Sequence, residues 1–250
     1  MITIINFLYY FSAFIIIMAM FGYPITLKLL GKLFINRKNN KDYNYKPTVT
    51  VMVVAHNEEK VILEKLNNII ALDYPKDKIE FLISSDNSTD RTNEIVKKFI
   101  VENPEYNIRL YEVKARKGKT NAQNEAQKTV KTEFLVMTDA NSIMDKKSVM
   151  ELMASFTTND ISYVSGSLVI INENSSDISK SEKKYWDSDL KLREIESKIQ
   201  SITAGNGAIY ACRNSEYVDF NPIQSHDSAM PLYFALNKKR AIYNNEAIAY

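Results

Sequence analysis

Apolar side chains fill the first part of the chain almost without interruption. No residue from 1 to 27 carries a charge, and residues 2–20 are apolar nearly throughout. As a helix, these 27 residues would reach about 40 Å, more than the roughly 30 Å hydrocarbon core of a bilayer. Pro24 would end or kink the helix near the interface. A buried core helix is usually shorter and amphipathic, so we predict a transmembrane helix over residues 1–30.

Positive charge follows the apolar segment. A signal peptide carries basic residues before its apolar run, and this chain has none there. We interpret residues 31–46 as a basic linker, in which Asp42 is the only acidic residue. The basic residues within and just before it are Lys28, Lys32, Arg37, Lys38, Lys41 and Lys46. By the positive-inside rule, this asymmetry predicts that the following domain is cytoplasmic.

Beyond Pro47, short apolar runs alternate with segments of helical character. The apolar runs predict strands over residues 48–54, 79–83, 108–113, 134–137, 163–171 and 209–211. The other segments predict helices over residues 58–70, 95–100, 181–202 and 228–237, with a polar surface loop over 172–180. This alternation indicates an α/β domain over residues 47–250, with a largely parallel sheet flanked by helices.

Three of the predicted strands end in polar side chains. These groups are His56-Asn57-Glu58, Asp86-Asn87 and Asp139-Ala140-Asn141. The carboxyl ends of parallel strands share one edge of the sheet, where ligands bind in open α/β folds. Three polar ends on one edge therefore indicate a site. Asp139 and Asn141 could hold a hard cation through oxygen, although the same residues also suit a strand that runs into an Asx-type turn.

Composition excludes several classes of protein. With 32 basic and 30 acidic side chains, the net charge of +2 argues against a nucleic-acid-binding protein. The single cysteine, Cys212, excludes an internal disulfide framework and a multi-cysteine zinc site. Neither a Walker A pattern nor GxGxxG is present. Phosphate would therefore be held by Lys119, by a metal ion or by backbone N–H groups.

Two features in the last fifth of the chain each allow two interpretations. Gly205 and Gly207 are separated by one residue, which suits either a close approach of the backbone to a ligand or a tight turn. Asp227 precedes a helical pattern, where a helix N-cap is one interpretation. The other is a general base at the entrance of a cleft.

Taken together, six segments resemble the family 2 nucleotide-sugar glycosyltransferases with the GT-A fold, in particular membrane-anchored bacterial members that build polysaccharides. The resemblance runs from about Pro47 to Tyr250. The segments, in order, are VVAHNEE (53–59), SSDNSTDRT (84–92), KGKTNAQN (117–124), FLVMTDAN (134–141), GNGAIYACR (205–213) and SHDSAMPL (225–232). Each segment alone is weakly specific, but six in this order and spacing are specific together.

The resemblance implies an inverting transferase that moves a sugar from a UDP-sugar to a saccharide or lipid-linked acceptor. Asp227 would be the catalytic base, and Asp86 would accept a hydrogen bond from the uracil ring. Asp139, at the family's DxD position, would hold Mg²⁺ or Mn²⁺ on the diphosphate together with Asn141. The remaining nucleotide-sugar-binding residues implied by the resemblance are Ala55, Asn57, Glu58, Lys119, Gly205 and Gly207.

The chain departs from the family pattern in three places. Asn141 is a neutral amide where the DxD motif has a second carboxylate, and His226 stands where a carboxylate is common. The QxxRW segment of processive synthases does not occur before Tyr250, so we expect the acceptor side to be incomplete, in a fragment or in a truncated, inactive form. A non-catalytic, nucleotide-sugar-binding or partner-binding subunit is therefore the alternative. A nucleotidyltransferase is disfavoured, because AHNEE does not resemble its glycine-rich loop.

Overall fold

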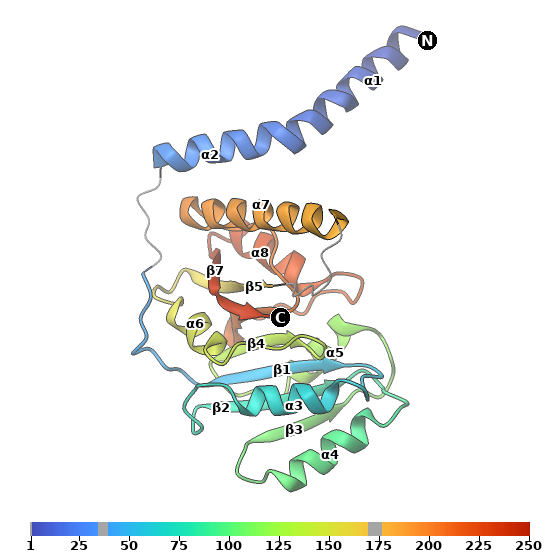
Figure 1. Ribbon diagram of the computed structural model, residues 1–250, viewed down its shortest axis with the longest axis vertical. Helices are drawn as coiled ribbons and strands as arrows, with labels where there is room; N and C mark the ends of the chain where they lie inside the picture. Colours follow the sequence, from blue (N-terminus) through green and yellow to red (C-terminus); the bar gives the residue numbers. More distant parts are fainter. Residues whose placement is uncertain (1, 35–39, 170–176) are drawn as a thin grey trace.

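The computed structural model describes residues 2–34, 40–169 and 177–250 of the chain (Figure 1). The N-terminal segment forms α1 (Ile2–Ile17), a π-helical turn η1 (Met18–Gly22) and α2 (Tyr23–Phe34). Within the described residues, one stretch, Thr3–Leu33, is long and apolar enough to cross a membrane, with a mean hydropathy of 2.1 over 18 consecutive residues. The predicted N-terminal helix is therefore confirmed as a candidate span, and it continues to Phe34, four residues into the predicted linker.

The domain that follows contains one sheet with helices on both faces. Its strands are β1 (Val49–Ala55), β2 (Ile79–Ser85), β3 (Ile108–Glu112), β4 (Phe134–Asp139), β5 (Ile161–Leu168), β6 (Ile209–Arg213) and β7 (Arg240–Ala249). Its helices are α3 (Ile62–Ile70), α4 (Thr92–Glu102), α5 (Lys119–Gln127), α6 (Ser148–Ala154), α7 (Asp177–Ile199), η2 (Asn214–Glu216) and α8 (His226–Leu236). The strand order is β3-β2-β1-β4-β6-β5-β7.

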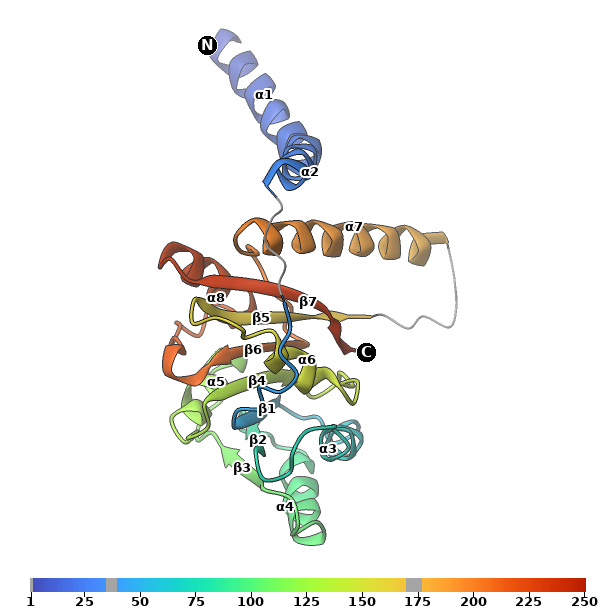
Figure 2. The same ribbon diagram turned by 90° about the vertical axis from the view of Figure 1, so that its left-hand side faces the viewer.

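The sheet is mostly parallel, as predicted. Four strand pairs, β1–β2, β1–β4, β2–β3 and β5–β7, are parallel. Among the strands of the described residues, the two pairs that involve β6 are antiparallel. β3 forms one edge, which agrees with the outer strand predicted over residues 108–113. In Figure 2, α3 and α4 lie on one side of the strands, whereas α5 and α8 lie on the other.

Successive side chains along each strand point to opposite faces of the sheet, which produces two hydrophobic clusters. In β1, Val51 and Val53 face the cluster formed with α3, α4 and α6, whereas Met52 faces the cluster formed with α5 and α8. Because both faces are covered, the strands are apolar runs rather than alternating sequences. This burial explains why the runs over residues 48–54 and 134–137 were strong signals for strands.

Several predicted boundaries are wrong. α3 begins at Ile62 rather than residue 58, and the backbone N–H of Glu58 donates to Thr92 Oγ1 (2.8 Å). α7 begins at Asp177, so the last part of the predicted loop is helical, and residues 172–176 lie outside the described residues. No sequence pattern predicted α6. Within the predicted linker, Lys41 forms an ion pair with Glu151 of α6 at 2.6 Å, so this part of the linker is attached to the domain.

Candidate active site

Three parallel strands deliver their polar ends to one cavity of about 300 Å³. Its lining is Val54, His56, Glu58, Asp86, Lys119, Asp139, Ala140 and Asn141. These residues come from the ends of β1, β2 and β4 and from the first turn of α5. The polar ends of these three strands therefore lie together at one edge of the sheet, as predicted.

Asp86 lies at the base of this cavity and is only 2% exposed. Its Oδ1 accepts a hydrogen bond from the Lys117 backbone N–H (3.2 Å), and its Oδ2 accepts one from Gly118 (2.9 Å). Gly118 has a φ of +93°, a conformation that favours glycine. Asp86 thus fixes the turn that leads to Lys119. Each carboxylate oxygen has a second acceptor position, so a ligand N–H can still bind.

The segment after β1 divides into structural and lining residues. Ala55 and Asn57, both predicted to bind nucleotide, do not line the cavity. The Ala55 carbonyl accepts from Asp86 N–H (2.9 Å), and Asn57 Oδ1 accepts from Thr89 N–H (2.8 Å). Their bonds connect the ends of β1 and β2. His56, in the same predicted stretch, does line the cavity, with its Nδ1 at 2.8 Å from the Asp86 carbonyl oxygen.

The opposite wall of the cavity carries the predicted metal ligands. Asp139 forms an ion pair with Lys119, and Asn141 lines the same cavity. Among the described residues, no group of three His, Cys, Asp or Glu side chains could hold a metal ion. One carboxylate and one amide oxygen nevertheless suit a hard cation that takes its other ligands from a diphosphate. The residues therefore fit a cation that binds together with the nucleotide.

A buried lysine supports that wall from beneath. Lys65 of α3 is fully buried, and its Nζ donates to Thr138 Oγ1 (2.7 Å) and to the Ser142 carbonyl (2.6 Å). These two acceptors bracket Asp139 and Asn141. Burial lowers the pKa of Lys65 to about 7. Sequence reasoning missed this residue, although it follows Ile62 by three positions and precedes Leu66, both on the buried face of the helix.

A second cavity, of about 180 Å³, contains Asp227. Its lining is Leu168, Leu190, Arg193, Gly205, Asn206, Gly207 and Asp227. Hydrogen bonds tie its walls together, because Gly205 N–H donates to the Asp227 carbonyl (2.7 Å) and Arg193 Nη1 donates to the Gly205 carbonyl (2.8 Å). The Asp227 carboxylate itself accepts from the Ser225 hydroxyl. Ser225 is the residue that precedes α8, so the N-cap interpretation of Asp227 is wrong.

Gly207 lies where the two cavities meet. A Cβ atom at this position would be 3.2 Å from Lys119 Nζ and 3.3 Å from Asp227 Oδ2. Lys119 lines the first cavity and Asp227 the second, so both approach the same short segment of backbone. Asp86 and Asp139 line one cavity and Asp227 lines the other, with Lys119 and Gly207 between Asp139 and Asp227. A side chain at Gly207 would lie between Lys119 and Asp227.

His226 contributes packing rather than a group in either cavity lining. It is buried, its Nε2 lies 3.1 Å from the Val218 carbonyl oxygen, and its ring lies 5.0 Å from that of Tyr217. Burial lowers its pKa to about 4, so the ring is neutral at physiological pH. The histidine at the family's carboxylate position therefore faces the interior and adds no charge to the site.

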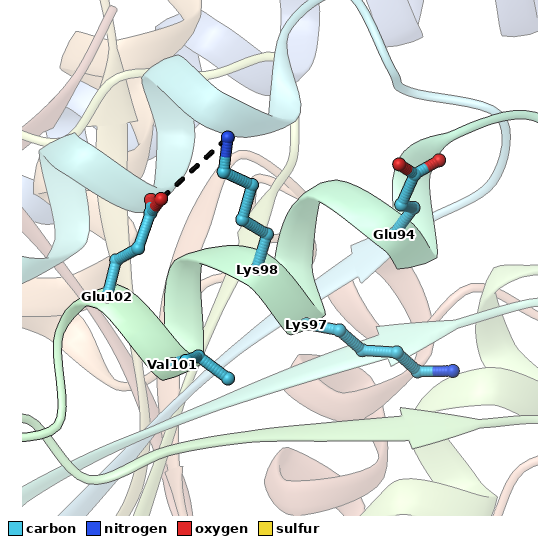
Figure 3. A pocket seen from close by; sticks show the side chains of 5 residues that line it. All are labelled: Glu94, Lys97, Lys98, Val101 and Glu102. Carbon is cyan, nitrogen blue, oxygen red and sulfur yellow. Dashed lines mark ion pairs between the residues drawn. The ribbon is translucent and has the colours of Figure 1, made fainter.

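The outer face of α4 is a different kind of surface (Figure 3). Its shallow depression is lined by Glu94, Lys97, Lys98, Val101 and Glu102, all from a single helix. Lys98 and Glu102 form an exposed ion pair at 3.7 Å. Exposed pairs of this kind contribute little stability or specificity.

The chain is similar in sequence to known glycosyltransferases. The family model for glycosyl transferase family 2 matches residues 50–218, more than half of the chain. The probable glycosyltransferase YdaM of Bacillus subtilis is 36% identical over 121 residues, which cover 47% of this chain and 27% of that protein. The poly-beta-1,6-N-acetyl-D-glucosamine synthase of Staphylococcus epidermidis is 24% identical over 177 residues, covering 69% of this chain and 41% of that protein. The chain thus spans less than half the length of either relative.

The fold is also that of a solved glycosyltransferase. The mannosyltransferase PcManGT from Pyrobaculum calidifontis, solved in complex with GDP-Man and Mn²⁺, superposes with a TM-score of 0.79 and 25% sequence identity. The superposition covers 95% of this chain and 66% of that one, and it confirms the predicted GT-A fold. From the family match over residues 50–218 and this shared fold, the chain belongs to glycosyl transferase family 2.

Proposed function

We propose that the protein transfers a sugar, with inversion, from a UDP-sugar to a saccharide or lipid-linked acceptor at the cytoplasmic face of the membrane. The observation that carries this proposal is the meeting of the two cavities at Gly207. Lys119 and Asp139 lie on one side of it, and Asp227 lies on the other. A direct displacement needs this arrangement, because the leaving group and the acceptor occupy opposite faces of the sugar.

The nucleotide occupies the larger cavity in this proposal. Asp86 accepts a hydrogen bond from the base, and Lys119 leaves Asp139 to bind the diphosphate. Asp139 and Asn141 hold Mg²⁺ or Mn²⁺, which when bound stabilises the negative charge that develops on the diphosphate. The ammonium of Lys119 stabilises the same charge from the protein side.

The acceptor enters through the smaller cavity. Asp227 takes the proton of the acceptor hydroxyl as its oxygen forms a bond to the anomeric carbon. The bond from that carbon to the phosphate oxygen breaks, and its electron pair stays on UDP. Gly207 allows the sugar to approach the backbone, since it presents no side chain towards Lys119 and Asp227. Arg193 holds this loop through the Gly205 carbonyl.

UDP release from a panel of UDP-sugars tests the reaction. We expect Asp227→Asn to lower kcat by about 10²- to 10⁴-fold and to leave UDP affinity unchanged. Asp139→Ala should weaken Mn²⁺-dependent UDP binding. Glu94→Gln on the exposed face of α4 is the matched control and should behave as the wild type. Undiminished turnover in both site variants would remove the mechanism.

The nucleotide requires its own test, because PcManGT was solved with GDP-Man. The panel therefore includes GDP-sugars at the same concentrations. We expect turnover with UDP-sugars to exceed that with GDP-sugars, and Asp86→Ala to reduce this preference. A preference for GDP-sugars would replace the donor class but leave the roles of Asp139 and Asp227 in place.

A non-catalytic nucleotide-sugar-binding subunit is the second candidate. The neutral Asn141 at the second position of the metal motif favours it, since an amide contributes less charge to a cation than a carboxylate does. Calorimetry with UDP and Mn²⁺ separates the two candidates. Tight UDP binding without release of UDP from any sugar donor would favour the binding subunit.

A further inference from the structure

The apolar N-terminal segment bends after about one membrane thickness. The 16 residues of α1 and the five of η1 end at Gly22, and as a helix they would reach roughly 32 Å. The hydrocarbon core of a bilayer is about 30 Å thick. At the bend, Tyr23 N–H donates to the Met18 carbonyl, which is the wider π-helical bond. Pro24 has no N–H to donate, so a change of direction here is expected.

After the bend, α2 packs along α7. Leu27 and Gly31, one turn apart on α2, are both buried. The Tyr23 hydroxyl donates to the carboxylate of Glu196 on α7. Both views of the molecule draw α2 beside α7, whereas α1 points away from the domain (Figures 1 and 2). α2 is therefore part of the domain surface, while α1 is not.

α7 cannot lie within hydrocarbon. Its described side chains include six charged residues in its last three turns, namely Asp189, Lys191, Arg193, Glu194, Glu196 and Lys198. Charged side chains strongly oppose insertion into the bilayer core. Because α2 packs on α7, a membrane-crossing α2 would carry these charges into the hydrocarbon. The packing therefore keeps α2 at the membrane surface or in water.

The opposite face of α2 identifies the surface that it contacts. Ile25, Leu29 and Leu33 are spaced four residues apart and are 58%, 55% and 77% exposed. At about 100° per residue they point away from Leu27 and Gly31, which face α7. Lys28 and Lys32 form a second exposed row beside the apolar one. An exposed apolar row with adjacent lysines is the pattern of a helix that lies in a lipid–water interface.

We propose that α2 is an interfacial helix, which lies in the plane of the bilayer surface and holds α7 against it. The occupant of its outward face is the lipid bilayer itself, because this face is continuous with α1, the candidate span. Lys28 and Lys32 contact anionic headgroups. The membrane span then ends at Gly22 rather than at residue 30. This placement rests on the membrane location in the proposed function, and it deepens that function.

The placement has a consequence for the acceptor. α7 contributes Leu190 and Arg193 to the cavity that contains Asp227. A single helix therefore contacts α2 on one side and the candidate acceptor cavity on the other. With α2 in the headgroup layer, only α7 separates the acceptor cavity from the bilayer surface. The distance between them is then about the diameter of one helix, roughly 10 Å. This position favours an acceptor whose reactive hydroxyl is carried by a lipid.

Depth-dependent fluorescence quenching tests the placement of α2. The full chain is reconstituted into phosphatidylcholine vesicles after Trp186→Phe removes its single tryptophan. A new tryptophan is then introduced by Leu29→Trp in α2, or by Phe11→Trp in α1 as the deep reference. We expect Leu29→Trp to be quenched most by lipids brominated near the headgroup and Phe11→Trp by lipids brominated near the chain end.

Two results would overturn the placement. Strongest quenching of Leu29→Trp by deep bromines would mean that α2 continues the span, and no quenching would mean that α2 lies in water. The measurement needs neither a donor nor an acceptor, so it is independent of transferase activity. A chain with the expected depth that releases no UDP would remove the proposed reaction and keep the interfacial helix.

The lysines are tested by lipid selectivity. Quenching of Leu29→Trp by brominated phosphatidylglycerol should exceed that by brominated phosphatidylcholine at least about twofold, at equal mole fractions and low salt. Lys28→Gln with Lys32→Gln should bring this ratio close to one. Lys97→Gln with Lys98→Gln on α4 removes the same charge elsewhere and should preserve it. A ratio near one before any lysine is replaced would refute the headgroup contact.

Discussion

Replacement of Gly205 by alanine would test how closely the glycine loop is packed against the site. A Cβ atom there would lie 1.9 Å from Tyr163 Oη and 3.0 Å from the Asp227 carbonyl oxygen. Carbon atoms in contact usually lie about 3.5–4.0 Å apart. Tyr163 is 0% exposed and stacks on Tyr210 at 5.3 Å, so it cannot move away freely. The loop itself is held by Arg193.

Overpacking of a buried site costs about 1–3 kcal/mol, and we expect Gly205→Ala to lower the free energy of unfolding by about 2–3 kcal/mol, because both neighbours are fixed. Tyr163→Phe should relieve part of this loss. Tyr163 Oη makes no hydrogen bond among the described residues, so its removal alone should cost little. The double variant should therefore be less destabilised than the sum of the single variants by about 1 kcal/mol or more.

Urea unfolding of the full chain in detergent, followed by fluorescence, measures all four proteins of this cycle. UDP release in parallel shows whether the loop also positions Asp227, since Gly205 N–H donates to its carbonyl. We expect Gly205→Ala to lower kcat, and Tyr163→Phe to restore part of it. A loss below about 0.5 kcal/mol, which is typical of an unconstrained surface position, would refute the packing argument. Additive effects would also refute it.

Three further predictions concern charged or buried side chains. Lys119→Met leaves Asp139 without its ion pair, which is partly exposed and therefore worth up to about 1 kcal/mol. In calorimetry, Mn²⁺ should then bind the nucleotide-free variant up to roughly fivefold more tightly than the wild type. Unchanged Mn²⁺ affinity would contradict this. Burial lowers the pKa of Lys65 to about 7, below the 10.5 of an exposed lysine. Between these two pH values the unfolded state therefore binds more protons than the folded state. The free energy of unfolding, relative to that of Lys65→Met, should rise with pH above 7 by up to about 1.4 kcal/mol per pH unit. A flat difference from pH 7 to 9 in urea unfolding would refute the shift. Burial lowers the pKa of His226 from 6.5 to about 4. The free energy of unfolding, relative to that of His226→Phe, should therefore decrease as the pH falls from 6.5 towards 4. Equal acid sensitivity of the two proteins would refute this.

The polar ends of the parallel strands could be predicted from sequence because two local patterns coincide there. A strand buried on both faces is a short apolar run, and its end is marked where polar residues begin. Asp86 and Asp139 follow such runs, three and two residues after the last apolar residue. The parallel arrangement then places them on one edge without any knowledge of side-chain contacts. Glu58, in the polar segment after β1, also lines the cavity, as does Lys119, which only the resemblance placed near the nucleotide.

The errors concern contacts between residues that are distant in sequence. Asn57 is not in the cavity lining, and its side chain accepts a hydrogen bond from the backbone N–H of Thr89, 32 residues later. His56 faces the cavity because the Asp86 carbonyl holds its ring. Neighbouring residues after a strand point in different directions, and their own sequence does not say which one faces the ligand. Lys65 was missed for a related reason. The groups that bind its ammonium, on Thr138 and Ser142, are more than 70 residues away in sequence.

The direction of β6 is the feature on which the candidate site most depends. β6 is antiparallel to β4, and Ile209 pairs with Thr138, the residue before Asp139. The chain therefore enters β6 at the edge where β4 ends, which brings Gly207 between Lys119 and Asp227. A parallel β6 would place Gly207 at the opposite edge, about 17 Å away for a strand of five residues. An apolar run encodes burial but not direction, so the sequence predicted this strand but not its role. One reversed strand in a mostly parallel sheet thus connects the cavity that contains Asp139 with the cavity that contains Asp227.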